Sequence, residues 1–330
     1  MFQLKTWFIF GALCFGLIIL ILVSLSIGSI ELSFRDIFGL LIDPSHVGNE
    51  VKQLIFFESR LPRTLTALLV GAALAGSGVI FYYLAGNDLA CPSLLGINYG
   101  VYFAIICGVI LMATPSIPSI FVCGAVGGLV TGGIVYLITL RSGFEPLKLI
   151  LVGQIISLCM YAACQLLFIL APTKVENLVI NLNGSLANSS FTQFNSYAWL
   201  LLVTIFIVSI LIRSNYLLSL GIDMAKSIGL NTRFLIFILL GLILFISTIS
   251  VVLVGPLLFF PLLAVQIGLL LASRHRPYLF LFMSLLVGAL LLLGADVILR
   301  LIYHDWEAPL NIFIAVLGVP ILIYRSKALR

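Results

Sequence analysis

The sequence predicts an all-α, polytopic membrane protein with about ten transmembrane helices. Of the 330 residues, 62% are hydrophobic and only 9% are charged, and the mean hydropathy is +1.27. A soluble domain is roughly half apolar and about a quarter charged. The charges stand in short clusters between apolar runs of about 20 residues, the length needed to cross a bilayer. A single transmembrane domain, residues 1-330, is therefore expected to fill the chain.

Charges, prolines and polar clusters divide the chain into ten spans. They lie near 7-28, 61-85, 93-113, 117-140, 147-171, 197-213, 233-254, 259-272, 277-299 and 309-325. The runs 197-213 and 259-272 are short for a full crossing. Gly255-Pro256 and Pro261 also interrupt the helical pattern. We therefore expect a discontinuous element near residue 259, whose irregular backbone is shielded by protein.

The N-terminal run and the basic residues predict the orientation. Trp7 to Val23 is an apolar stretch longer than the 7 to 15 residues or so of a signal peptide, so we expect a retained first span. Of the 17 Lys and Arg residues, eleven fall on one side of the ten spans and six on the other. The richer side is normally cytoplasmic, which predicts that both termini lie in the cytoplasm.

Small residues at helical spacing predict close helix packing. Gly124, Gly128 and Gly132 recur at every fourth position, and Gly71 and Ala75 repeat the same spacing. Such stripes let two backbones approach each other in lipid. We interpret them as packing surfaces that give no information about the cargo.

Enzyme, metal and nucleic-acid functions find no support in the sequence. The six cysteines lie in apolar runs or a short loop without a CxxC pair, which is typical of buried free thiols. No histidine falls within a span near a carboxylate, and no Gly-Lys pair exists to form a phosphate loop. Nucleic-acid binding is a poor interpretation of a net charge of +5. We expect a non-catalytic chain without metal or cofactor, so that any ATP hydrolysis occurs on a partner.

A polar stripe marks the fifth span. Its members, at helical spacing, are Gln154, Ser157, Tyr161 and Gln165. Such residues inside a membrane face either protein or water. The stripe therefore predicts either the lining of a transport path or hydrogen bonding between helices.

Polar and charged residues are most frequent in the segments that connect the spans and at the ends of the spans. Arg60 and Arg63 open the second span at the outer side, and Asp296 precedes Arg300 by one helical turn near the outer end of the ninth. These arginines could anchor to lipid or bind carboxylates of a partner, and Arg300 could pair with Asp296. On the inner side, segment 214-232 contains a stretch bounded by Gly221 and Gly229 that is too short and polar to cross.

At these residues the chain resembles the FecCD family, the permease subunits of binding-protein-dependent ATP-binding cassette (ABC) importers for iron(III)-siderophores, heme and cobalamin. The resemblance covers about residues 55 to 327. Its motifs are Arg60 to Arg63, Val70 to Ala75, Ser77-Gly78, Asn87, Leu89-Ala90, Pro92, Leu94 to Gly96, Leu220 to Asn231, Gly255-Pro256 with Phe259, Ala295-Asp296 with Arg300, Glu307, Pro309 and Leu317-Gly318 to Pro320.

The resemblance implies a type II ABC importer permease, a ten-helix subunit that dimerises around a central path. It implies two cytoplasmic ATPase subunits carrying ATP and Mg, and a periplasmic or lipid-anchored substrate-binding protein outside. The coupling residues would be Leu220, Gly221, Asp223, Ala225, Lys226, Ser227 and Gly229. Arg60, Arg63 and Arg300 would receive acidic residues of the binding protein. Asn87 and Leu89 would help to close the path, which the fifth and tenth helices would line.

Departures from the family pattern qualify the partner and the cargo. Pro261, Val265, Gln266 and Leu269 stand where the family usually has glycine, proline, histidine and arginine. They favour one of two unlike permeases in a heterodimer, and the Glu145-Pro146-Leu147 loop weakens a cobalamin assignment. The predicted function is inward transport of an iron(III)-siderophore across the bacterial cytoplasmic membrane. Heme, cobalamin or an oxyanion are alternative cargoes, and a secondary transporter or intramembrane enzyme are the rivals.

Overall fold

The fold is known from a computed structural model, which describes residues 2–28, 32–42, 50–88, 90–112, 116–141, 146–179, 183–302 and 309–328. Helices account for the secondary structure of these residues, and no strand occurs in them. In chain order they are α1 (Phe2–Ser26), α2 (Phe34–Ile42), α3 (Glu50–Leu54), η1 (Ile55–Arg60), α4 (Leu61–Ala85), η2 (Pro92–Leu95), α5 (Ile97–Leu111), α6 (Ile117–Arg141), α7 (Pro146–Leu170), α8 (Pro172–Val179), α9 (Phe191–Ser219), α10 (Ile222–Ser227), α11 (Thr232–Val254), α12 (Phe260–Leu271), α13 (Pro277–Ile302) and α14 (Leu310–Ala328).

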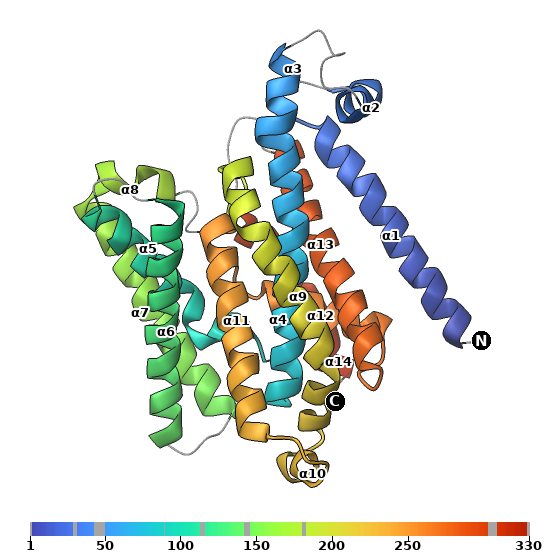
Figure 1. Ribbon diagram of the computed structural model, residues 1–330, viewed down its shortest axis with the longest axis vertical. Helices are drawn as coiled ribbons and strands as arrows, with labels where there is room; N and C mark the ends of the chain where they lie inside the picture. The colour runs from blue at the N-terminus through green and yellow to red at the C-terminus, as the bar shows by residue number, and fades with distance from the viewer. Residues whose placement is uncertain are drawn as a thin grey trace.

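The long helices form a bundle with α4 at its centre. α4 packs against α9, α11, α12 and α13, while α5, α6 and α7 pack against one another and meet the rest of the bundle through α11. α1 stands at the edge, α2 and α3 lie at one end, and α10 lies at the opposite end (Figure 1). The N-terminal end of α1 and the C-terminal end of α14 both lie toward the α10 end.

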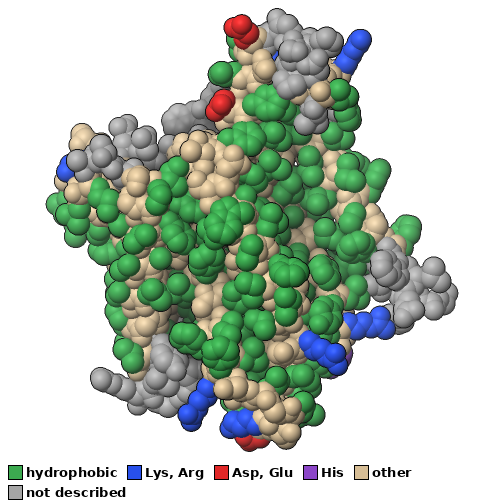
Figure 2. Space-filling model, viewed as in Figure 1, with side chains coloured by type: hydrophobic (Ala, Val, Ile, Leu, Met, Phe, Trp, Pro, Cys, Tyr) green, Lys and Arg blue, Asp and Glu red, His purple; other side chains and the backbone are tan. Residues whose placement is uncertain are grey.

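The surface has the charge distribution of a membrane protein. In the view of Figure 2, hydrophobic side chains cover the middle of the bundle, and the charged side chains gather at its two ends. Seven described helical runs are long and apolar enough to cross a membrane, and α5, α12 and the first part of α14 are shorter apolar helices. Seven and three make ten, one for each predicted span.

Two spans differ in length from the sequence prediction. The run 197-213 was expected to be short, but α9 extends over 29 residues, because polar residues at both ends continue the helix beyond the apolar core. The second span is preceded by helix from Glu50 onward, giving 36 helical residues. Pro62 has no N–H to donate to the carbonyl of residue 58. The turn before it, η1, is correspondingly a wider π-helix.

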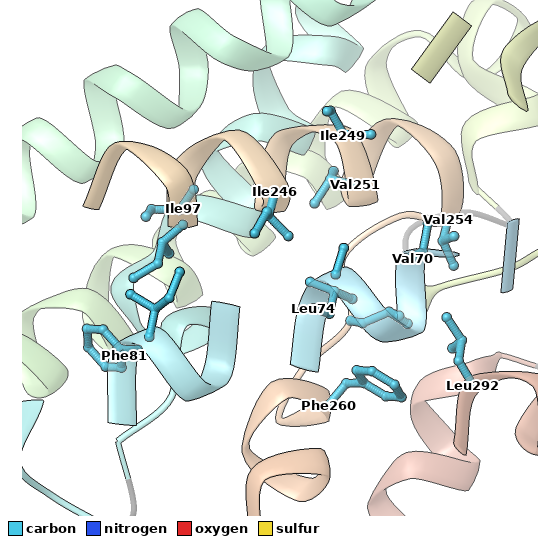
Figure 3. Packing of buried hydrophobic residues seen from close by; sticks show 14 of the residues in the cluster. Val70, Leu74, Phe81, Ile97, Ile246, Ile249, Val251, Val254, Phe260 and Leu292 are labelled. Atoms are coloured by element: carbon cyan, nitrogen blue, oxygen red, sulfur yellow. The ribbon is translucent and has the colours of Figure 1, made fainter. Parts of the chain in front are cut away.

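Close backbone contacts and buried aliphatic side chains hold the bundle together. A Cβ atom added to Gly71 of α4 would lie 2.5 Å from the backbone oxygen of Gly288 in α13, so only glycine permits this crossing. Val70 and Leu74 of α4 lie among Val254 of α11, Phe260 of α12 and Leu292 of α13 in the core (Figure 3). The predicted packing role of Gly71 is confirmed.

The expected discontinuity is confirmed between α11 and α12. α11 ends at Val254 and α12 begins at Phe260, and Phe259 has a positive φ of 56°. Side chains bond to backbone groups that lack a helical partner at this break. Asn311 of α14 accepts from the N–H of Leu258 at 3.0 Å and donates to the oxygen of Pro256 at 2.9 Å. The irregular backbone is therefore shielded by protein, as its membrane setting requires.

Candidate functional site

A buried carboxylate joins two of the predicted docking arginines at the end of the bundle that carries α2 and α3. Arg63 of α4 donates to Asp296 of α13 from Nη2 to Oδ1 at 2.7 Å, and from Nε to Oδ1 and Oδ2 at 2.9 and 3.2 Å. Arg300 Nη2 lies 2.8 Å from Asp296 Oδ2. The Asp296 side chain is only 2% exposed. One carboxylate therefore serves two guanidiniums, one from α4 and one from its own helix.

Two of the predicted docking arginines, Arg60 and Arg300, hold the C-terminal turn of α1. Arg60 Nη1 donates to the carbonyl oxygens of Leu25 and Ser26, each at 2.8 Å. Arg300 donates to the carbonyl oxygens of Ser24 and Ile27 at 3.2 and 3.3 Å, and to Ser24 Oγ at 2.7 Å. The last carbonyls of a helix lack partners within it and carry partial negative charge. The guanidiniums therefore act as caps of α1.

All three arginines predicted to bind a partner make hydrogen bonds within the chain. The predicted Asp296–Arg300 pair is confirmed. No sequence pattern indicates that Arg63, which is 233 positions from Asp296, binds the same carboxylate, or that α1 takes part. Arg60 is 4% exposed, so its guanidinium is occupied inside the chain. Docking of a binding protein on these arginines stays a prediction, and any partner would meet a cluster that is already hydrogen-bonded.

A second ion pair links the short helices at this end. Lys52 Nζ of α3 lies 2.9 Å from Asp36 Oδ2 of α2, and the backbone N–H of Ser33 donates to the same oxygen at 3.2 Å. The hydrogen bond from Lys52, followed by that from Ser33, lowers the pKa of Asp36 below its ordinary value of 3.8. This pair holds α2 against α3.

At the opposite end, α10 presents an exposed surface. Gly221 has a φ of 132° and Gly229 a φ of 87°, so glycine permits the turns on both sides of this six-residue helix. The exposed side chains in and beside this helix include four apolar ones, those of Leu220, Ile222, Met224 and Ile228. The polar side chains of Asp223, Lys226 and Ser227 are also exposed. Ala225 is the exception among the predicted coupling residues, because it is fully buried. Its methyl group packs inside the chain, so it is not available to a partner.

The polar stripe lies at the border between the packed and open faces of α7. Ser157 is buried, Gln154 and Tyr161 are half-buried and Gln165 is exposed. Gln165 Nε2 donates to the Tyr161 hydroxyl at 3.0 Å, and the Tyr161 ring meets Tyr99 of α5 edge-on. Path lining and helix packing both fit this position in a single chain, so the path-lining role stays a prediction.

The predicted inner loop leads into the broken helix region. Asn87 is half-buried and its carbonyl accepts from the N–H of Ala90 at 3.1 Å, whereas Leu89 lies outside the described residues. Gln266 of α12 donates to the Asp88 carbonyl, and Ser93 Oγ accepts from the N–H of Phe259 at 3.3 Å. The loop is therefore tied directly to the discontinuity. Gln266, noted as a departure from the family pattern, makes one of these ties.

Side chains that could hold a metal ion do not gather in the described part of the chain. Within it, no group of three His, Cys, Asp or Glu residues is arranged to hold a metal ion, and none of the six cysteines forms a disulfide. The functional features of the described residues are thus the arginine cluster, the surface of α10, the stripe on α7 and the broken helix.

Comparison with known proteins gives the family. Residues 16–327 match the FecCD transport family. The chain belongs to the FecCD transport family. It is 33% identical over 309 residues to the Fe(3+)-citrate import system permease protein YfmD of Bacillus subtilis, covering 92% of this chain and 90% of that protein. It is 31% identical to the Fe(3+) dicitrate transport system permease protein FecD of Escherichia coli, covering 94% and 95%.

A solved structure supports the same assignment for this FecCD protein. An inward-facing metal-chelate type ABC transporter superimposes with a TM-score of 0.80 at 29% identity, covering 96% of this chain and 99% of that one. The chain is therefore an ABC transporter permease, a multi-pass protein of the cytoplasmic membrane and not a catalytic subunit. The family assignment made from the motifs is confirmed.

Proposed function

We propose that this FecCD permease moves an iron(III) chelate, an iron(III)-siderophore or iron(III)-citrate, into the cell, driven by ATP hydrolysis on a partner. The observation that carries the proposal is the family match over residues 16–327, together with relatives named for Fe(3+)-citrate import that align along nearly the whole chain. The iron chelate is cargo here, so no resident metal site is needed in the chain.

The proposed assembly contains two cytoplasmic ATPase subunits, a second permease and a periplasmic or lipid-anchored substrate-binding protein. ATP and Mg would bind the ATPases, and this chain would carry no cofactor of its own. The exposed apolar residues of α10 support an ATPase contact, because Leu220, Met224 and Ile228 stand open at a polar end of the bundle. With α10 and both termini in the cytoplasm, the arginine cluster would lie outside. Alternating access would open the path to each side in turn.

Heme, cobalamin and oxyanions remain the alternative cargoes for the same architecture. Uptake of radioactive iron by cells that lack this gene distinguishes them. Cells carrying the gene on a plasmid are expected to regain uptake of ⁵⁵Fe-citrate or of a ⁵⁵Fe-siderophore, and to show no gain for heme or cobalamin. Restored uptake of heme or cobalamin with no effect on any iron(III) chelate would contradict the proposed cargo.

A further inference from the structure

We propose that Asp296 is a positioning residue for docking. It holds Arg63 in the orientation in which an acidic partner protein binds it, and it connects that docking point through Arg300 to the C-terminal turn of α1. This inference rests on the proposed function, because it requires a substrate-binding protein that docks at this end of the bundle.

Exposure gives the three arginines different roles. The Arg63 side chain is 21% exposed and that of Arg300 is 14% exposed, while Arg60 as a residue is 4% exposed. Arg60 donates to two carbonyls at the end of α1, and Arg300 to two others. Arg63 has the most accessible side chain of the three, and its hydrogen bonds to described residues all go to Asp296 and not to α1. It is therefore the member that a carboxylate from outside reaches, and the other two hold α1.

The grip of Asp296 fixes the plane of the Arg63 guanidinium. Three hydrogen bonds of 2.7, 2.9 and 3.2 Å run from its Nη2 and Nε to the two carboxylate oxygens. Nη1 is not used in this contact. An arginine held in advance loses less conformational freedom when a partner binds. Asp296 thus prepares Arg63 for docking while being too deeply buried, at 2% exposure, to contact the partner itself.

The cluster also keeps an excess of positive charge. The two guanidiniums of Arg63 and Arg300 share the single carboxylate of Asp296, so these three groups sum to 2 − 1 = +1. Arg300 Nε is buried and has no hydrogen-bond partner among the described residues. A partner carboxylate at Arg63 complements this excess. Since Asp296 shares its charge between Arg63 and Arg300, a change at Arg63 alters the hold of Arg300 on Ser24 and Ile27.

The direction in which one substitution changes the Kd distinguishes a positioning role of Asp296 from simple charge attraction. Asp296→Asn raises the positive charge of the cluster by one, so attraction alone predicts tighter binding of an acidic protein. Positioning predicts weaker binding, by about tenfold or more in Kd, because Arg63 loses its bidentate support. A purely structural role predicts a lower Tm with unchanged Kd and unchanged salt slope. Asp296→Glu restores the charge and is expected to recover part of the affinity.

The experiment measures Kd at two salt concentrations for the reconstituted transporter and its purified substrate-binding protein. Asp36→Asn is the matched control, because it removes one carboxylate at the same end of the bundle without touching Arg63, and it should not weaken binding. The double variant Asp296→Asn, Arg300→Gln leaves the net charge of Arg63, Asp296 and Arg300 unchanged at +1 and avoids an uncompensated buried cation. It should also bind about tenfold more weakly.

The link to α1 has its own readout. Docking to the wild-type transporter should change amide hydrogen exchange in the last turn of α1, residues 22–28, and should not do so in Asp296→Asn. If the wild-type transporter binds the substrate-binding protein, and Asp296→Asn and the double variant Asp296→Asn, Arg300→Gln bind it with the same Kd, the positioning role is overturned. If docking leaves amide exchange in residues 22–28 of the wild-type transporter unchanged, the link to α1 is overturned. If the wild-type transporter bound no substrate-binding protein at all, the proposed function itself would be contradicted.

Discussion

Single polar side chains sustain the irregular parts of this membrane protein. Asn311 satisfies two backbone groups of the broken segment, and Asn98 of α5 donates to the Leu257 carbonyl at 3.3 Å. The sequence predicted the break from Gly255-Pro256 and Pro261. It could not predict the partners, because they lie far away in the chain and asparagine has no spacing signal of its own. The same holds for Arg63 and Asp296, whose residue types were noted but whose contact depends on the packing of α4 against α13.

Replacing Asn311 by Leu is expected to destabilise the protein markedly. The Leu258 N–H and the Pro256 carbonyl would both lose their partner, and each unsatisfied buried group costs about 1–3 kcal/mol. Thermal unfolding in detergent should show a lowered Tm. Ile312→Leu, at an exposed neighbouring position, should leave the Tm unchanged, and equal stability of the two variants would contradict the proposed role of Asn311.

The Asp36–Lys52 pair is expected to weaken in acid. The pKa of Asp36 is lowered in the folded state, so its contribution to stability is present above the ordinary value of 3.8 and is lost as the pH falls through the lower folded value. Amide hydrogen exchange in α2, corrected for the intrinsic effect of pH, should therefore accelerate below pH 3.8. Asp36→Asn should abolish this acid dependence; its persistence would assign the effect to another group.

At the scale of elements, apolar run length predicts the helices inside the membrane well and the positions of the helix ends less well. All ten predicted spans coincide with apolar helices, since a bilayer requires that length and composition. The sequence did not predict the helix that precedes α4 from Glu50 onward or the full length of α9, because polar residues at a membrane surface continue a helix without any hydrophobic signal. For the close crossing of α4 and α13, the sequence indicated only the α4 side, through the spacing of Gly71 and Ala75. The contact residue on α13, Gly288, is an isolated glycine in the sequence.

The crossing makes a direct prediction about glycine. Gly71→Ala would put a methyl group 2.5 Å from the Gly288 oxygen, so α4 and α13 must separate at a cost of roughly 1–3 kcal/mol. Gly241→Ala is the control, because nothing lies within 4 Å of a Cβ at that position of α11 and alanine favours helix. The Tm should fall in the first variant and hold or rise in the second; the reverse order would refute the packing argument.

The surface of α10 predicts which substitutions uncouple transport. Ile228→Glu changes an exposed side chain, so the permease should remain in the membrane while ATP hydrolysis no longer responds to the substrate-binding protein. Ala225→Leu places a large side chain in a fully buried site and should lower the amount of folded permease instead. Normal coupling in a well-expressed Ile228→Glu transporter would place the ATPase contact elsewhere.

The whole molecule is half of the proposed transport path, and this limits what the sequence predicts. Within the stripe on α7, Tyr161 and Gln165 contact each other, as their helical spacing predicts, because helical periodicity is a local property. Whether it faces water depends on the proposed second permease, which no pattern within this chain specifies. The proposed cargo is likewise inferred from the relatives and not from a site in this chain, because the described residues form no metal-ligand cluster.

Thiol labelling tests the stripe in the assembled transporter. Cysteines at Gln154, Tyr161 and Gln165, introduced after removal of the six native ones, should react with a water-soluble reagent during turnover. A cysteine at Ile156 should be protected, because that side chain packs beside Gly96 next to η2. Similar protection of all four positions would favour helix packing as the role of the stripe.

The central claim is that this permease carries an iron(III) chelate inward at the expense of ATP. The most direct measurement uses proteoliposomes that contain the complete transporter, with ATP and Mg on the ATPase side and the substrate-binding protein loaded with ⁵⁵Fe-chelate on the other. The account predicts that ⁵⁵Fe moves to the ATPase side only when ATP is hydrolysed, and that Ile228→Glu abolishes the movement. Equal ⁵⁵Fe movement with and without ATP, or ATP-driven movement in the opposite direction, would contradict it.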